Sequence, residues 1–206
     1  LPGVAPGAKI YAYKVLSAAG PGWSSDIIAA IERCADPNLD GNFLDHLDVC
    51  SLSLGGGGDP DDPMSLAIDL ASKNGVVFTV AAGNSGPAAG TVGSPGTSRE
   101  AITVAAACKP GSTTRVCQGS SIATFSSRGP IPNFPQVLKP DVAAPGVDIC
   151  AARFGSYASG SECKDTVHIA ISGTSLATPH VAGLAAIIRQ ANPSLTPADV
   201  KAIIIG

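Results

Sequence analysis

The sequence predicts an α/β fold of three layers, in which a mostly parallel, twisted sheet has helices on both faces. The first observation is that apolar runs of strand length alternate with segments of helical periodicity. The second is the composition, whose 45% hydrophobic residues and 24 glycines indicate an aliphatic core with many tight turns. We expect residues 1–206 to form one domain, because a chain of this length can bury roughly 70% of its unfolded surface.

The first half of the chain supplies two predicted strands and two predicted helices. Residues 8–16 alternate and then run apolar, as a strand in a covered sheet does. Proline suits the first turn of a helix, and an Asn-Gly pair suits its end. The predicted elements are a strand at 8–16, a helix capped by Ser24 or Ser25, a strand at 49–54, and a helix from Pro63 to Asn74-Gly75.

The second half continues the alternation and ends in two helices. Strands are predicted at 76–82, 101–107, 122–125, 147–150 and 167–171, with helices after Ser175 and from Thr196-Pro197. In a parallel sheet, functional groups gather in the loops after the carboxyl ends of the strands. We therefore expect a site where the loops at 54–58, 83–87 and 173–175 meet.

Charge and hydropathy narrow the class of partner. The net charge is −3 and no run of Lys or Arg occurs, which argues against a nucleic-acid or polybasic membrane surface. No apolar run reaches the roughly 18 residues that span a bilayer. The partner is expected to be a polypeptide or a small molecule.

Cysteine usage indicates an oxidising compartment. Six cysteines lie as three pairs that are close in sequence, and each pair would close a turn-rich loop. Disulfides predict a secreted, extracellular protein, while free, buried cysteines in a cytosolic protein are the alternative. Zinc is disfavoured, because no C-x-x-C spacing occurs. The pairs suggested by proximity are Cys34 with Cys50, Cys108 with Cys117, and Cys150 with Cys163.

The stretch from Ser172 to Leu184 holds the clearest candidate for chemistry. An apolar strand, a turn at Gly173 and a helix of small residues place Ser175 at a helix start. Unpaired N–H groups and the helix dipole favour negative charge there, which suits a hydroxyl that becomes a nucleophile. The alternative is that Thr174 or Ser175 only caps the helix.

Two segments far apart in the sequence carry the same resemblance. Residues 173–180, Gly-Thr-Ser-Leu-Ala-Thr-Pro-His, resemble the nucleophile motif of the subtilisin-like serine peptidases, and residues 81–86 resemble the oxyanion-hole segment of that family. The resemblance implies Ser175 as the nucleophile and Asn84 as the oxyanion donor of an endopeptidase. A lipase-type elbow is disfavoured, because Ala177 stands where Gly-x-Ser-x-Gly requires glycine.

The sequence does not place a catalytic base. His180 follows Ser175 by five residues on one helix and lies about 140° around its axis, while His168 and His46 belong to no motif for a base. Because the family order is Asp, His, Ser, the resemblance puts both missing residues before Leu1. It thus implies a domain that is incomplete at its N-terminus and clipped at its C-terminus, with an N-terminal fragment of the same domain as a possible partner.

The resemblance also implies a substrate-binding edge and pocket walls. Residues 53–55 resemble the strand that pairs with an extended substrate, which is reasonable because backbone hydrogen bonds hold any extended peptide. The pocket walls carry no charge, so we expect apolar or medium-sized substrate side chains to be favoured. The substrate-binding candidates are Ser53, Leu54, Gly55, Ala82, Gly83 and Gly93.

An acidic loop at residues 36–48 suggests structural calcium. Oxygen-bearing side chains stand at alternate positions before Gly41, as in calcium-binding loops, but Leu47 occupies the position of the usual glutamate. The alternative is a solvated acidic turn. The metal candidates are Asp36, Asn38, Asp40 and Asp45, with Asp48 as the alternative to Asp45.

The sequence therefore predicts part of a secreted, subtilisin-type serine endopeptidase that uses no organic cofactor. Without its base, this chain alone should be nearly inert as a peptidase. The main alternative is a non-catalytic chain, either a pseudo-peptidase that binds peptides or a half that needs its N-terminal piece. A calcium-stabilised structural domain leaves the loops of Asn84 and Ser175 unexplained, and an esterase needs a base that the chain does not place.

Overall fold

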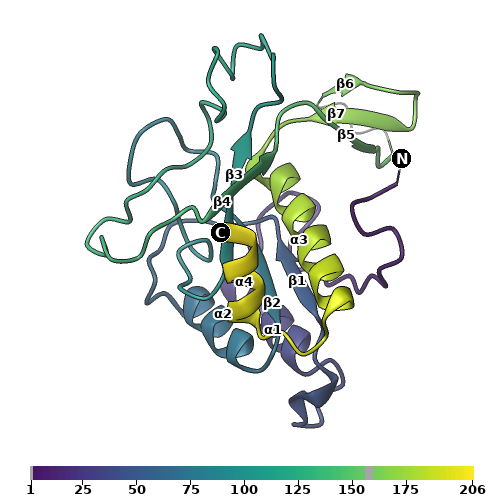
Figure 1. Ribbon diagram of the computed structural model, residues 1–206, viewed down its shortest axis with the longest axis vertical. Coiled ribbons are helices and arrows are strands. Elements are labelled where there is room, and N and C mark those ends of the chain that lie inside the picture. Colours follow the sequence, from purple (N-terminus) through teal and green to yellow (C-terminus); the bar gives the residue numbers. More distant parts are fainter. Residues whose placement is uncertain (1, 156–159) are drawn as a thin grey trace.

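The centre of the molecule is a parallel sheet of four strands in the order β1-β2-β3-β4 (Figure 1). This computed structural model describes residues 2–155 and 160–206. All three neighbouring pairs run parallel, and the register sets Val49 beside Val77, Thr79 beside Ile102, and Val104 beside Val142. The strands are β1 (Val49–Leu52), β2 (Val77–Ala81), β3 (Ile102–Ala107) and β4 (Val142–Pro145).

Four helices among the described residues cover the two faces of this sheet, which confirms the predicted three-layer α/β fold (Figure 1). Successive residues of a strand point to opposite faces. Phe78 accordingly packs in the core cluster with residues of α1 and α2, whereas Val77 packs in the cluster with residues of α3 and α4. The helices are α1 (Ser24–Ala35), α2 (Pro63–Lys73), α3 (Thr174–Ala191) and α4 (Pro197–Ile205), and a short 3₁₀ turn, η1, spans Phe43–Asp45.

A second, smaller sheet is antiparallel and follows the carboxyl end of β4. It has the order β5-β7-β6, with β5 (Ile149–Ala152), β6 (Ser161–Glu162) and β7 (His168–Ile171). The apolar strand before the Ser175 helix is therefore confirmed as a strand, but it pairs in this outer sheet. From β7 the chain turns at Gly173, whose N–H donates to the carbonyl of Gly146 at 2.8 Å, and enters α3.

Three local predictions are wrong. Residues 8–16 do not form a strand, because they find no ladder partner among the described residues, and Ile10 is 84% exposed. Neither serine caps α1, since the helix begins at Ser24 itself and its N-cap residue, Trp23, makes no side-chain capping bond. Residues 122–125 contribute only one isolated bridge, between Ala107 and Ile122.

The three disulfides predicted from proximity are present. Their cysteines are 16, 9 and 13 residues apart, in chain order. The first ties the end of α1 to β1, and the third ties β5 to the segment just after β6. Each bond limits the unfolded chain and so stabilises the fold. The pairs are Cys34–Cys50, Cys108–Cys117 and Cys150–Cys163.

Charged side chains gather at the amino ends of the central strands. Lys139 is buried, forms an ion pair of 2.7 Å with Asp141 and donates to the carbonyl of Ala101 at 2.7 Å, just before β3. Lys201 of α4 approaches the other oxygen of Asp141 at 3.2 Å. Burial lowers the pKa of Lys139 from 10.5 to about 8, against the opposing attraction of Asp141.

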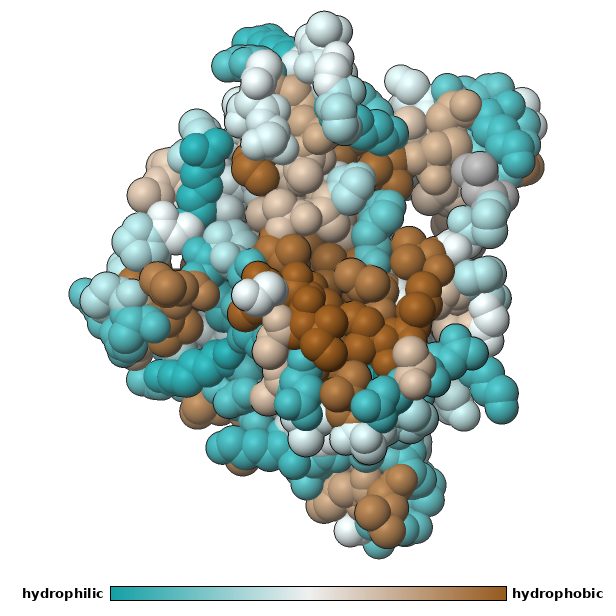
Figure 2. Space-filling view, viewed as in Figure 1, coloured by the Kyte–Doolittle hydropathy of each residue, from teal (hydrophilic) through white to brown (hydrophobic). Residues whose placement is uncertain are grey.

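An apolar surface lies over α3 and α4 (Figure 2). Its exposed members include Leu184 and Ile187 of α3, and Ile203 and Ile205 of α4. Large exposed apolar patches on soluble proteins mark places where other polypeptide packs or where molecules self-associate. Among the described residues, no helix has the length and apolar character needed to cross a membrane.

Candidate active site

Ser175 is the second residue of α3, as the sequence predicted. Gly173 is the N-cap and has no side chain to bond the first turn, so N–H groups of that turn face the loop edge of the sheet. Ser175 is half-buried and lies beside the ends of β1 and β2. A positive helix end next to an accessible hydroxyl is the environment that favours charge at that oxygen.

Thr174 holds Asn84 beside Ser175, a role that the sequence analysis missed. Gly83 has a φ of +104°, which turns the chain sharply after β2 and sends Asn84 toward α3. The side-chain oxygen of Asn84 accepts hydrogen bonds from the backbone N–H of Thr174 at 2.9 Å and from its hydroxyl at 3.1 Å. Because that oxygen is occupied, the amide NH₂ group of Asn84 remains as a donor. Thr174, considered only as a helix cap, thus fixes the orientation of Asn84.

The hydroxyl of Thr174 also accepts the N–H of Gly83 at 3.2 Å. The loop after β2 and the start of α3 are therefore joined at three points through one side chain and its backbone N–H. The only sequence signal for this role was the position of Thr174 next to the candidate nucleophile.

Ser53 and Ser175 bond each other across the end of β1. The hydroxyl of Ser175 donates to the carbonyl of Ser53 at 3.2 Å, and the hydroxyl of Ser53 donates to the carbonyl of Ser175 at 2.8 Å. Ser53 therefore contacts the candidate nucleophile, Ser175, although β1 itself ends at Leu52. The carbonyl that would pair with an extended peptide is occupied by the hydroxyl of Ser175.

A cleft of about 840 Å³ opens in front of Ser175 and Asn84. Five of the six substrate-binding candidates line it, and the sixth, Ser53, contacts the lining residue Ser175: the five are Leu54, Gly55, Ala82, Gly83 and Gly93. A side chain at Gly93 would overlap the carbonyl of Gly56, so the two glycine-rich walls meet closely. The loop at 54–58 lines the cleft as expected, but the sequence analysis missed the lining residues Asp59 and 131–134, which belong to no recognisable motif.

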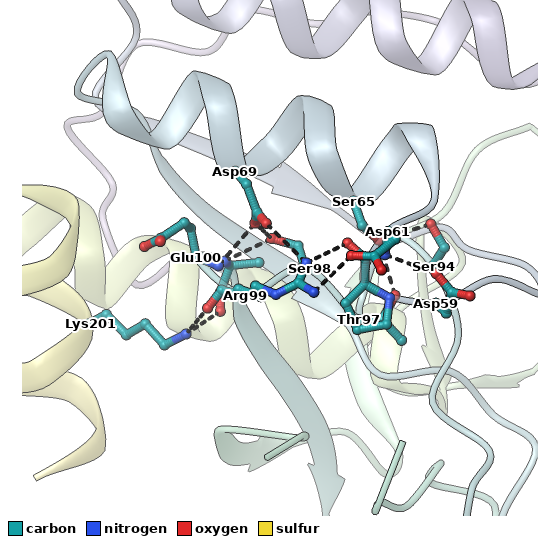
Figure 3. A network of polar contacts seen from close by, with 12 residues as sticks. Asp59, Asp61, Ser65, Asp69, Ser94, Thr97, Ser98, Arg99, Glu100 and Lys201 are labelled. Carbon is teal, nitrogen blue, oxygen red and sulfur yellow. Dashed lines mark hydrogen bonds and ion pairs between the residues drawn. The ribbon is translucent and has the colours of Figure 1, made fainter. Parts of the chain in front are cut away.

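A buried polar network fixes one wall of this cleft to α2 (Figure 3). Ser94 donates to the carboxylate of Asp62 at 2.7 Å and bonds the hydroxyl of Ser65 at 3.1 Å, and Ser65 also bonds Thr97 at 3.0 Å. The backbone carbonyl of Ser94 accepts the N–H of Gly56 at 2.8 Å, which joins this wall to the opposite one. Satisfied buried networks of this kind make a structure rigid.

None of the three histidines contacts Ser175 in the part of the chain that the structure describes. His180 bonds the carbonyl of Leu176 at 2.8 Å, one helical turn back, as expected for a structural histidine. His46 bonds the carbonyl of Leu47 at 3.1 Å. His168 pairs with Asp165 at 2.6 Å, and its hydrogen bond holds the pKa of the Asp165 carboxyl below its ordinary value.

The acidic loop brings three of its carboxylates together. Oxygen atoms of Asp36, Asp40 and Asp45 lie within 4.8 Å of one another. Asn38 belongs to the same turn, because its side-chain oxygen accepts the N–H of Asp40 at 2.9 Å. Asp48 instead faces Arg189 at 3.7 Å, so the structure groups Asp45 and not Asp48 with the cluster. Hard oxygen donors of this kind suit calcium.

The fold and this site define an α/β protein with a serine at a helix start, opposite a side-chain amide, at the carboxyl edge of a parallel sheet. The sequence matches the subtilase family, Peptidase_S8, over residues 1–206, and the chain belongs to that family. This finding confirms the family predicted from the two motifs.

Named relatives and solved structures support the same assignment. The chain is 41% identical to Serine protease AprX of Bacillus subtilis over 98% of its own length and 47% of that protein. It is 35% identical to Subtilisin Savinase of Lederbergia lenta, over 97% of its own length and 60% of that protein. The structure of Sphericase superposes with a TM-score of 0.74 at 36% identity, covering 96% of this chain and 59% of that one. The chain thus spans about half to three fifths of the length of these three proteins.

Proposed function

We propose that this chain is the nucleophile and oxyanion-binding portion of a secreted, subtilisin-type serine endopeptidase. The observation that carries the proposal is the fixed amide of Asn84 beside Ser175 at the edge of the cleft. A helix cap alone needs no such amide, whereas acyl transfer needs a donor aimed at the developing oxyanion. Membership of the subtilase family supports the same reading.

In the proposed reaction, an extended polypeptide lies along Ser53 to Gly55 with its side chains against the walls at Ala82-Gly83 and Gly93. The Ser175 oxygen attacks the peptide carbonyl carbon while its proton passes to a base. The carbonyl oxygen becomes the oxyanion and accepts hydrogen bonds from the Asn84 amide and the Ser175 N–H. The C–N bond then breaks, the base returns its proton to the amine, and water hydrolyses the ester by the same steps.

The base and its orienting carboxylate are proposed to come from polypeptide outside these 206 residues. The described histidines bond elsewhere, and the hydroxyl of Ser175 is directed at the Ser53 carbonyl. An N-terminal part of the same domain, bearing the Asp and His of the family, would contact the hydroxyl of Ser175. The second candidate function is that of a non-catalytic chain that only binds peptides. The observation that favours it is that the hydroxyl of Ser175 bonds the carbonyl of Ser53 and not a base.

A fluorophosphonate probe tests the proposed nucleophile. The folded chain is incubated with the probe, and intact mass followed by peptide mapping locates the adduct. We expect one adduct, on Ser175, that Ser175→Ala abolishes. The matched control is Ser172→Ala, because Ser172 lies three residues away and accepts the N–H of Asp148 at 2.9 Å. An adduct on another residue, or labelling that survives Ser175→Ala, contradicts the proposal.

We also propose that the loop of Asp36, Asn38, Asp40 and Asp45 holds a structural calcium ion. The converging carboxylates fit the donor set that calcium prefers. The loop lies directly after α1 and is bracketed by Cys34 and Cys50, so an ion there would tie the helix to the start of β1. Its contribution would be to stability, far from the cleft.

Thermal melting tests the calcium proposal without an activity assay. Calcium at about 100 times its dissociation constant should stabilise the fold by about 2.7 kcal/mol. Asp40→Asn should remove most of this gain. Asp61→Asn, which makes the same change in another acidic loop, should keep it. Equal calcium responses in both variants contradict the assignment.

A further inference from the structure

Asp59 is the one charged residue among the described residues that line the cleft. The other lining residues are glycines, apolar residues and neutral polar residues. Asp59 follows the Gly55–Gly58 wall, at the end of the cleft that carries the candidate substrate edge. The uncharged pocket expected from the sequence therefore has one exposed carboxylate at its margin.

Asp59 and the turn that follows it are anchored by hydrogen bonds. Its carboxylate accepts the N–H of Asp61 at 2.8 Å, and its carbonyl accepts the N–H of Asp62 at 3.2 Å. Pro60 is buried, and its carbonyl accepts the guanidinium of Arg99 at 2.8 Å. One oxygen of Asp59 is thereby oriented by the turn, and the position of the residue does not depend on a bound ligand.

The charge of Asp59 is not balanced by a neighbouring cation. Arg99 bonds the carbonyl of the next residue, Pro60, but its guanidinium pairs with Asp61 at 2.7 Å. Figure 3 shows Asp59 beyond Asp61, on the side away from Arg99. Among the described residues, no ion pair includes Asp59, and the carboxylate cluster suited to a metal lies elsewhere, at Asp36, Asp40 and Asp45.

Asp62 adds a second negative charge just behind the same wall. Its carboxylate accepts the N–H of Met64 at the start of α2 and the hydroxyl of Ser94, and both donors are neutral groups. A Cβ built at Gly58 would lie 3.1 Å from an oxygen of Asp62, so only glycine backbone separates that carboxylate from the cleft wall. The end of the cleft at residues 58–59 is therefore negative.

We propose that Asp59 is a specificity-determining residue that selects peptides with a lysine or arginine side chain at this end of the cleft. The inference rests on the proposed function, because it takes the cleft to be the peptide-binding site. A cationic side chain would run along the glycine wall with its aliphatic part and place its charge against the free oxygen of Asp59. An acidic side chain at the same place would be repelled.

Equilibrium binding of matched peptides tests this role. Three hexapeptides that differ only in one central residue, lysine, norleucine or glutamate, are titrated into the chain and into the Asp59→Asn variant. Because exposed ion pairs contribute up to about 1 kcal/mol, the lysine peptide should bind about twofold to fivefold more tightly than the norleucine peptide. The glutamate peptide should bind most weakly, and added salt should reduce all these differences.

The variants separate this inference from the proposed function. Asp59→Asn should bring the lysine and norleucine affinities together, while Asp26→Asn, the same change on the exposed side of α1, should leave their ratio unchanged. Equal affinities in the unmodified chain, or a lysine preference that survives Asp59→Asn, overturn the inference while peptide binding stands. Failure of all three peptides to bind contradicts the proposed function, and the inference with it.

Discussion

The two ends of the central sheet carry different kinds of polar group. At the carboxyl ends, Ser175 and the fixed amide of Asn84 border a cleft in which Asp59 is the one charged residue among the described lining residues. At the amino ends, Lys139 and Asp141 form a buried ion pair beneath α4. The contrast teaches that the candidate site uses neutral, solvent-accessible polar groups, whereas buried charge holds the layers together.

The largest effect is expected from breaking the ion pair at the amino ends. Asp141→Ala leaves the Lys139 ammonium buried without its partner and removes the acceptor of the Thr103 N–H. We expect a loss of about 3–5 kcal/mol in the free energy of unfolding, measured in urea, because an uncompensated buried charge is costly. A loss near that of the surface control Asp26→Ala would show that the pair does not hold the layers.

The next largest effect is expected at the carboxyl ends of the central strands, on the rate of ester hydrolysis. Asn84→Ala should lower the residual hydrolysis of an activated peptide ester by about 10²–10³-fold, because it removes an oxyanion donor. The matched control is Asn133→Gly, which changes another cleft asparagine whose φ of +64° glycine tolerates. Equal rates in the Asn84 and Asn133 variants would contradict the assignment of Asn84.

The pH dependence of stability sharpens the comparison. The pKa of Lys139 is about 8 in the fold and 10.5 in its unperturbed state. Below pH 8 the amine of Lys139 is protonated in both the folded and the unfolded chain, so the free-energy cost of burying its charge is constant. Between pH 8 and 10.5 the unfolded chain binds more protons, so stability should rise with pH, by about 2 kcal/mol at pH 9.5.

Urea unfolding at a series of pH values checks this expectation. Lys139→Met should flatten the rise, since no proton is then lost at this position on folding. A stability that falls steadily from pH 8 to 9.5 in the unmodified chain would mean that the Lys139 ammonium is not penalised by burial.

The smallest effect is expected from Thr174, which acts through Asn84. Thr174→Val removes the hydroxyl that bonds Asn84 and Gly83 but keeps the backbone N–H bond to Asn84. A single hydrogen bond contributes about 0.5–1.5 kcal/mol, so ester hydrolysis should slow by about threefold to tenfold. Thr174→Ser should restore the rate. Identical rates in the Thr174→Val and Thr174→Ser variants would show that the hydroxyl does not orient Asn84.

The sequence predicted the layers, and it named the residues of the candidate site, because both follow from local pattern. Apolar periodicity located β1, β2, β3 and the helices, and the segments around Ser175 and Asn84 carried recognisable motifs. Cysteine proximity gave the disulfides, since short loops close easily.

The features that were predicted wrongly or missed depend on partners that lie far away in the sequence. Residues 8–16 have a strand pattern, but a strand needs a neighbour for its ladder, and none of the described residues provides one. The orientation of Asn84 by Thr174 spans 90 residues, and the charge of Asp59 at the cleft depends on how a glycine-rich loop folds. No periodicity or spacing encodes such contacts.

The central claim is that this chain supplies a nucleophile and an oxyanion site without the base that would activate them. Chemical rescue tests it most directly: fluorophosphonate labelling of Ser175 is timed in the folded chain with increasing imidazole, and again with Asn84→Ala. We predict slow labelling that accelerates in proportion to imidazole and slows again when Asn84 is removed. Rapid labelling without imidazole would contradict the claim, because one of the chain's own groups would then be acting as the base.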